Sequence, residues 1–122
     1  MSRVRFVQPK IVRLTISDGD FIDIKNELTA GEEREAFARM TKVLEAGRRP
    51  QLDPEQVELS TLVAYVVGWS LLDAEGQPVE VMEDAFKALD SATFLEIYKA
   101  IEAHEQALAL QKKTPPADAS KS

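Results

Sequence analysis

The sequence predicts an α+β fold that is mainly α-helical, in which an N-terminal β-hairpin packs on a bundle of about four helices. Two observations support this fold class. Apolar and polar residues alternate over residues 11–24, which is typical of half-buried strands. From residue 30 onward, apolar residues recur at spacings of three and four between helix-start and helix-stop residues. With 122 residues, of which 44% are apolar, the chain is expected to form a single compact domain over residues 1–111.

The hairpin is expected at residues 11–24, around a turn at Asp18-Gly19. Both turn residues tolerate the positive φ that a tight hairpin turn requires. Because two strands alone are only marginally stable in water, we expect helices to cover the aliphatic face of this hairpin.

The first helix is expected at about residues 30–46. Thr29 and Glu32 have the spacing of a capping box, in which the threonine hydroxyl and the glutamate carboxylate each accept a backbone N–H. At the other end, Gly47 and Pro50 are residues that stop a helix.

The second helix is expected at about residues 54–72, with Asp53 as its cap and Pro54 at its first position. Its second half is apolar nearly all round, which indicates a buried helix containing a largely buried Trp69. The β-branched run in this half also fits a strand, but the start signal and the length favour a helix. Gly68 costs a helix about 1 kcal/mol relative to alanine, so we expect another backbone to pass close to it.

A short helix is expected at about residues 82–89, and a final helix opened by Asp90 at about residues 91–110. Residues 112–122 have the composition of a disordered tail, because apart from prolines they have no apolar side chain larger than alanine. His104 falls on or beside the apolar stripe of the final helix, which is typical of the edge of a core or an interface.

Few residues of the sequence are suited to active-site chemistry. The absence of cysteine excludes disulfides, thiol nucleophiles and thiolate zinc sites, and the single histidine, His104, excludes multi-histidine metal sites. Asp18, Asp20 and Asp23 resemble a calcium loop, but the loop is too short and no bidentate glutamate follows, so we interpret them as turn residues. We expect no enzyme activity, no cofactor and no metal; a small enzyme that uses Asp or Glu side chains is a weaker alternative.

Acidic residues are concentrated in the C-terminal half of the chain. The formal net charge is −6, and residues 50–111 contain twelve acidic and only two basic residues. Such a segment repels phosphates, so we expect no nucleic-acid partner. The longest nearly apolar run, Leu62 to Leu72, is shorter than the roughly 20 residues that span a bilayer. No signal peptide is recognised, and we expect a soluble cytoplasmic protein without a membrane partner.

Four segments of the sequence resemble the tail assembly chaperones of long-tailed bacteriophages and related prophages. They are the strand-rich residues 11–25, the helix opening at residues 27–32, residues 66–79, and Leu-Asp-Ser-Ala-Thr-Phe at 89–94 before the final helix. The most distinctive string is Trp-Ser-x-x-Asp-x-x-Gly-x-Pro-Val, at residues 69–79.

This resemblance implies a non-catalytic role in virion assembly. It implies that the protein binds the tape-measure protein, keeps its long apolar helical surface from aggregating and helps to recruit tail-tube subunits in the bacterial host cytoplasm. Such chaperones are generally absent from the mature virion. Related genes commonly also produce a longer form by a ribosomal frameshift. Lys112-Lys113 is a candidate position for such a slip, and lysines just past a helix C-terminus also complement the helix dipole, so the sequence leaves both interpretations open. If it is produced, this longer form is a further candidate partner.

The candidate partner-binding residues lie on the last two expected helices: Phe86, Phe94, Ile97, Ile101 and His104. The free edge of the hairpin is a further candidate surface. An apolar stripe at helical spacing marks a core as readily as an interface, so the sequence leaves these two roles open. The alternative function is a structural adaptor or tail-completion subunit that is retained in the virion.

Overall fold

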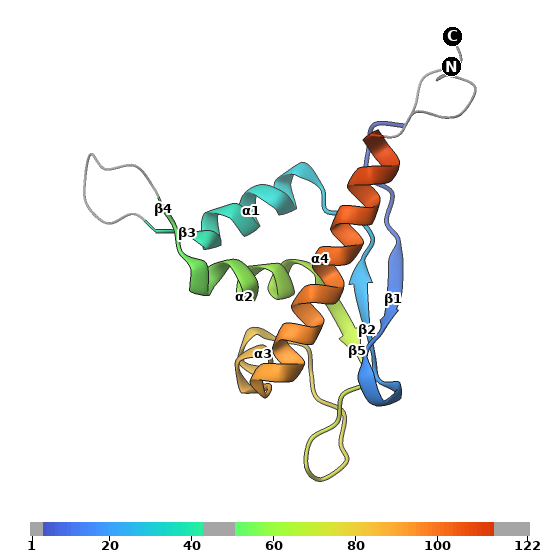
Figure 1. Cartoon of the computed structure of the whole chain (residues 1–122), viewed down its shortest axis with the longest axis vertical. Helices are drawn as coiled ribbons and strands as arrows, with labels where there is room; N and C mark the ends of the chain where they lie inside the picture. Colours follow the sequence, from blue (N-terminus) through green and yellow to red (C-terminus); the bar gives the residue numbers. More distant parts are fainter. Residues whose placement is uncertain (1–3, 43–50, 114–122) are drawn as a thin grey trace.

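The computed structural model describes residues 4–42 and 51–113, which form an α+β fold dominated by helices, as the sequence predicts (Figure 1). A three-stranded antiparallel sheet in the order β1-β2-β5 lies at one side of this part of the chain. The described elements, in chain order, are β1 (Ile11–Thr15), η1 (Ser17–Gly19), β2 (Phe21–Lys25), α1 (Ala30–Met40), β3 (Thr41–Lys42), β4 (Gln51–Leu52), α2 (Pro54–Tyr65), β5 (Val66–Trp69), α3 (Glu83–Ala88) and α4 (Ser91–Lys113).

The hairpin of β1 and β2 confirms the expectation for residues 11–24. Its register runs from Ile11 opposite Lys25 to Thr15 opposite Phe21. The turn uses a positive φ at both expected positions, 58° at Asp18 and 79° at Gly19. Local turn chemistry therefore sets this register, as the Asp-Gly pair indicates.

The expectation of a helix over residues 54–72 is wrong in its second half. The helix α2 ends at Tyr65, and residues 66–69 form the strand β5. This strand pairs with β2, placing Val66 opposite Ile24 and Trp69 opposite Ile22. Without β5, one edge of β2 would have unpaired backbone N–H and C=O groups. The valines and the tryptophan of β5 are residue types that favour a strand.

Gly68 does have a neighbouring backbone, as expected, although the reason is strand pairing rather than helix packing. It lies opposite Asp23 of β2, and a Cβ at this position would come within 3.5 Å of the Asp23 carboxylate. That separation is an ordinary van der Waals contact, so the position does not demand glycine sterically.

The first helix is shorter than expected, because α1 ends at Met40 and Thr41 is extended, with φ −97° and ψ 150°. Thr41–Lys42 pairs with Gln51–Leu52, and the Met40 carbonyl accepts the Asp53 N–H at 2.7 Å. The last carbonyl groups of a helix have no partner within the helix. Here the Asp53 N–H supplies a partner for the carbonyl of Met40, the last residue of α1. The expected continuation through residues 43–46 and the stop at Gly47 lie outside the described residues.

The remaining helices lie close to their expected positions. The short helix α3 spans Glu83–Ala88, one residue shorter at each end than expected. The helix α4 begins at Ser91 as expected but continues to Lys113, so residues 112 and 113 are helical rather than part of a tail. The rest of the expected tail, residues 114–122, lies outside the described residues.

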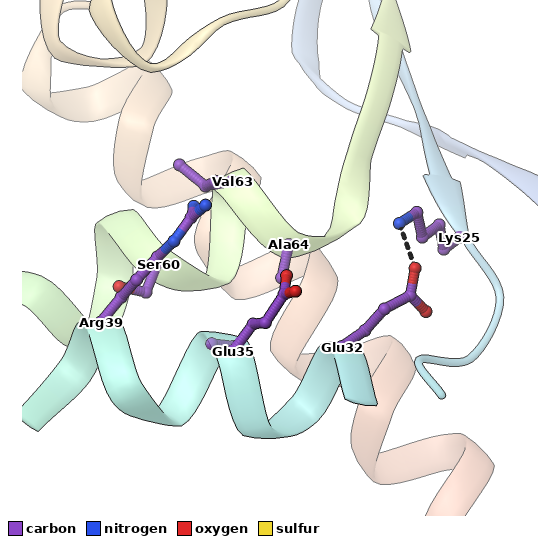
Figure 2. A pocket seen from close by; sticks show the side chains of 8 residues that line it. Lys25, Glu32, Glu35, Arg39, Ser60, Val63 and Ala64 are labelled. Atoms are coloured by element: carbon purple, nitrogen blue, oxygen red, sulfur yellow. Dashed lines mark hydrogen bonds and ion pairs between the residues drawn. The ribbon is translucent and has the colours of Figure 1, made fainter. Parts of the chain in front are cut away.

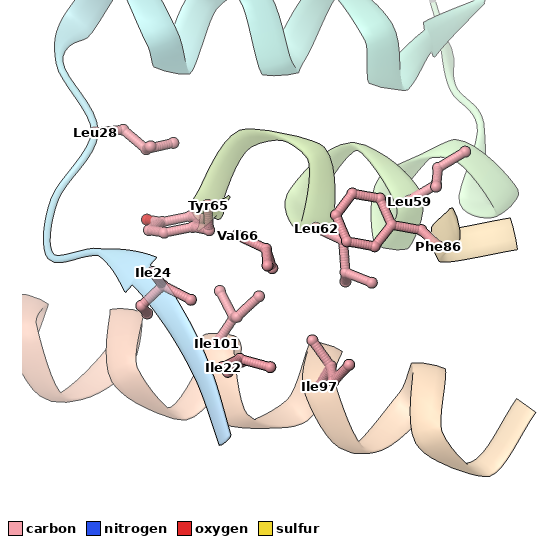
Figure 3. Close-up of a cluster of buried hydrophobic side chains, with 10 residues drawn as sticks. All are labelled: Ile22, Ile24, Leu28, Leu59, Leu62, Tyr65, Val66, Phe86, Ile97 and Ile101. Carbon is pink, nitrogen blue, oxygen red and sulfur yellow. The ribbon is translucent and has the colours of Figure 1, made fainter. Parts of the chain in front are cut away.

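The core lies between α2, α4 and the inner face of the sheet (Figure 3). Ile97 and Ile101 of α4 are fully buried, as are Ile22 and Ile24 of β2. The ten side chains of this cluster are Ile22, Ile24, Leu28, Leu59, Leu62, Tyr65, Val66, Phe86, Ile97 and Ile101.

Trp69 connects β5 to the segment that leads into α3. Its ring meets Phe86 edge-to-face, with the ring centroids 5.4 Å apart, and its Nε1 donates to the Val79 carbonyl at 2.7 Å. Trp69 lies in a strand and is half-buried, so the expectation that it belongs to a buried helix is wrong.

Replacing Trp69 with alanine is expected to lower the free energy of unfolding by about 3–5 kcal/mol, because it opens a cavity against Phe86. Trp69→Phe should cost about 1–3 kcal/mol, mainly through the unpaired Val79 carbonyl. Urea denaturation followed by circular dichroism measures both values. Leu110→Ala, at a position that is 67% exposed, should stay within about 0.5 kcal/mol of the parent. A loss below 1 kcal/mol for Trp69→Ala would contradict this packing.

Candidate functional site

An apolar recess on the helical side of the described chain lies between α2, α3 and the start of α4. We call it the α3 hollow. It encloses about 400 Å³ and is lined by Glu58, Phe86, Lys87, Leu89, Ser91, Phe94 and Leu95.

Two helix ends build the α3 hollow. The helix α3 stops at Ala88 because Leu89 is extended, and Asp90 then caps α4. The Asp90 carboxylate accepts the Thr93 N–H at 2.8 Å and the Thr93 hydroxyl at 2.9 Å. The backbone hydrogen bond from Thr93 is the main reason that the pKa of Asp90 is lowered. This cap sets the direction of the first turn of α4, and with it the position of Phe94 and Leu95.

The structure divides the five sequence-predicted partner-binding residues between core and surface. Phe86, Ile97 and Ile101 are 2%, 0% and 0% exposed and belong to the core cluster. Phe94 is half-buried and lines the α3 hollow, as does Phe86. His104 is half-buried, and its Nε2 lies 2.9 Å from the Asn26 carbonyl oxygen.

His104 therefore lies at the edge of the core, one of the two places that its position on the helix indicates. A carbonyl oxygen only accepts, so His104 Nε2 carries the hydrogen and donates it. The bond joins α4 to the connection between β2 and α1.

A second recess, which we call the α1 hollow, lies where α1, α2 and α4 meet. It encloses about 160 Å³ and is lined by Leu28, Glu33, Ala36, Phe37, Met40, Thr61, Ala64, Tyr65 and Glu105. Phe37 is 58% exposed, so its ring forms an open wall of this hollow.

Two carboxylates of the α1 hollow lie close to one phenol. The Tyr65 hydroxyl donates to Glu105 Oε2 at 2.9 Å. Burial is the largest cause of the raised pKa of Tyr65, followed by the hydrogen bond to Glu105 and by the negative charges of Glu105, Glu33 and Glu27. Glu27 is paired with Lys112, but among the described residues neither Glu33 nor Glu105 has an ion-pair partner.

Acidic residues also lie between the two hollows. Burial raises the pKa of Tyr98, and the negative charges of Glu102, Glu58 and Glu105 add to the effect. Glu58 belongs to α2 and lines the α3 hollow, whereas Glu105 belongs to α4 and lines the α1 hollow. We call the surface that carries the two hollows and the acidic side chains around Tyr98 the α2–α4 face.

A third recess lies at the opposite edge of the interface between α1 and α2 (Figure 2). Its charged lining is balanced: Lys25 forms an ion pair with Glu32, and Glu35 and Arg39 add one charge of each sign. The hydrogen bond from Lys25, and then that from the Thr29 N–H, lower the pKa of Glu32. The same carboxylate completes the predicted capping box of α1, so this recess has a structural role.

The aspartates near the hairpin turn are engaged in structural contacts. Arg13 Nε donates to Asp23 Oδ1 at 2.8 Å, and the Arg13 guanidinium lies over the Phe21 ring. Asp20 accepts the Ser70 hydroxyl at 2.8 Å. Within the described ranges, no group of three or more His, Cys, Asp or Glu side chains is placed to hold a metal ion. In the same residues, no helix is both long and apolar enough to cross a bilayer.

Sequence reasoning missed the α1 hollow and the role of Leu95. The lining of the α1 hollow comes from four separate segments of the chain, so no local spacing reveals it. The available signal was the excess of acidic over basic residues in positions 50–111, which indicates carboxylates without partners. Compared with protein-family models, curated proteins and solved structures, the chain matches none.

We expect stability to fall in alkali because of Tyr65. A raised pKa means that the folded chain holds the phenol proton more tightly than the unfolded chain, whose tyrosine has the ordinary pKa of 10.0. The stabilising effect is complete below that pH and is lost above it, by up to about 1.4 kcal/mol per pH unit. Urea denaturation at several alkaline pH values should show a shallower decline for Tyr65→Phe than for the parent. An identical slope in both proteins would contradict the buried hydrogen bond to Glu105.

Proposed function

We propose that this protein is a non-catalytic tail assembly chaperone that binds an apolar helical segment of a phage tape-measure protein on its α2–α4 face. The α3 hollow is the observation that carries this proposal. It is a preformed apolar recess between helices, and amphipathic helices bind such recesses through side chains spaced by three or four residues.

The lining of the α3 hollow suits a protein ligand. Phe94 and Leu89 are half-buried, so they give the recess a firm apolar floor, and Leu95 is 39% exposed at its rim. Burying the exposed apolar area of such a rim favours association without any chemical step. Met82, which is 47% exposed, adds an adaptable apolar side chain next to α3.

The residues that carry the resemblance have identifiable structural roles. Trp69 and Val79, at the two ends of the distinctive string, are joined by the indole hydrogen bond. Between them, Asp73 accepts the N–H groups of Glu75 and Gln77, and Gly76 has a φ of 78°. The string thus forms a turn that leads the chain toward α3, whose Phe86 contacts Trp69 and lines the α3 hollow.

The proposal extends to tail-tube recruitment and to action in the bacterial host cytoplasm, with the protein leaving before the virion matures. Both follow from the resemblance alone. The alternative, a structural adaptor or tail-completion subunit, requires the protein to stay in the particle. Quantitative mass spectrometry of purified virions separates the two, because an adaptor is present at a fixed copy number and a chaperone is absent.

The decisive experiment co-expresses this chain with the candidate tape-measure protein and measures the amount that is soluble and co-purifies. Leu95→Asp should reduce co-purification about tenfold or more, because it places a charge on the rim of the apolar recess. Leu110→Asp is the matched control, since it makes the same change on the same helix at a position that is 67% exposed. Circular dichroism and the melting temperature confirm that both variants fold. Equal co-purification of the two variants would exclude the α3 hollow as the binding site.

A further inference from the structure

We infer that the α1 hollow is a subsite for one lysine or arginine side chain, contributed by the helical segment that binds the α3 hollow. This inference rests on the proposed function, because it assigns a second contact to the same bound segment. The two walls of the hollow have different chemistry, one apolar and aromatic and the other anionic.

The apolar part of the hollow fits the stem of a long basic side chain. Phe37, Met40 and Ala64 line it, and its volume is about 160 Å³. An apolar cavity of about 150 Å³ holds a molecule the size of benzene, so this hollow accommodates one side chain rather than a helix. Lysine and arginine pack their aliphatic stems on such surfaces and keep the charged group at the polar end.

The polar end of the hollow presents two carboxylates that lack a cation. Tyr65 donates to Oε2 of Glu105, which orients this carboxylate and leaves Oε1 available. Glu33 lines the same hollow from α1, and no described lysine or arginine pairs with either glutamate. Both carboxylates carry negative charge into the same hollow, so an ammonium or guanidinium group bound there is attracted to both.

The aromatic wall adds a second reason for a cation. The ring of Phe37 is 58% exposed and lines the hollow that Glu33 and Glu105 also line. A cation over an aromatic face is attracted to the negative charge of its π system. In the balanced recess at the other edge of α1, Lys25 and Arg39 of the chain itself already supply the positive charges. Among the residues that the structure describes, no lysine or arginine lines the α1 hollow, in contrast to the recess at the other edge of α1.

The spacing of the two hollows defines the pattern of the bound segment. Phe94 lines the α3 hollow and Glu105 lines the α1 hollow, eleven residues apart on α4. At 1.5 Å per residue this separation is about 16 Å, or three helical turns. The occupant is thus a helix with large apolar side chains at one end and a lysine or arginine about three turns away on the same face.

The first test uses n-butylammonium, which has the chemistry of a lysine side chain, as a probe of the full chain. NMR titration should shift the aromatic resonances of Phe37 and Tyr65 and the side-chain carboxyl resonances of Glu33 and Glu105. These shifts should disappear in the double variant Glu33→Gln, Glu105→Gln, in which the glutamine oxygen still accepts the Tyr65 hydroxyl. They should persist in Glu35→Gln, which removes the same charge at the opposite edge of α1. Absence of shifts in the parent would overturn the inference.

The second test compares two synthetic helical peptides with the same apolar residues, one with lysine three turns away and one with glutamine at that position. Glu33 and Glu105 are exposed, so we expect the lysine peptide to bind up to about fivefold more tightly by calorimetry, as for an exposed charge pair, and to lose this advantage in the double glutamine variant. Equal affinities, or an advantage that survives in the double variant, would refute the subsite and leave the proposed function standing. If butylammonium binds but neither peptide does, the α1 hollow is a cation site, but the proposed function and the assignment of that cation to a bound helical segment both fail.

Discussion

The aliphatic contact between β2 and α4 is the interaction on which the rest of the structure depends. Ile22 and Ile24 of the strand and Ile97 and Ile101 of the helix are all fully buried in one cluster. Burying each such side chain contributes about 1.5–3 kcal/mol, so this contact fixes α4 across the sheet. Phe94 and Glu105 lie on the margin of the same stripe of α4, where Phe94 lines the α3 hollow and Glu105 lines the α1 hollow. The α2–α4 face therefore depends on α4 being held in this orientation.

The ion pairs Arg13–Asp23 and Lys25–Glu32 lie at the sheet and at the start of α1, whereas the carboxylates Glu33 and Glu105 of the α2–α4 face have no ion-pair partner among the described residues. The α2–α4 face has no comparable set of bases among the described residues, because the segment that builds most of it contains twelve acidic and two basic residues. Unpaired carboxylates around apolar recesses increase solubility and also favour a basic partner.

The α3 hollow is a consequence of how α2 ends. Because the chain leaves α2 as a strand at Val66, the next residues reach the far end of the sheet before turning back at Asp73 and Gly76. Trp69 then holds the returning segment at Val79 and packs on Phe86, which sets α3 beside α2. The recess therefore depends on a strand pairing, an indole hydrogen bond and a helix cap that are far apart in the sequence.

The sequence alone determined the features that are set by contacts between near neighbours. The Asp18-Gly19 turn, the capping box of Thr29 and Glu32, and the Asp90 cap were all predictable, since each depends on residues within a few positions. Tertiary structure decided that residues 66–69 pair with β2 instead of continuing a helix, because the unpaired edge of β2 is supplied by distant residues. It also decided which residues of the α4 stripe are core and which line a recess. Helical periodicity places these side chains on one face, but only the position of the sheet and of α2 determines how much of that face is covered.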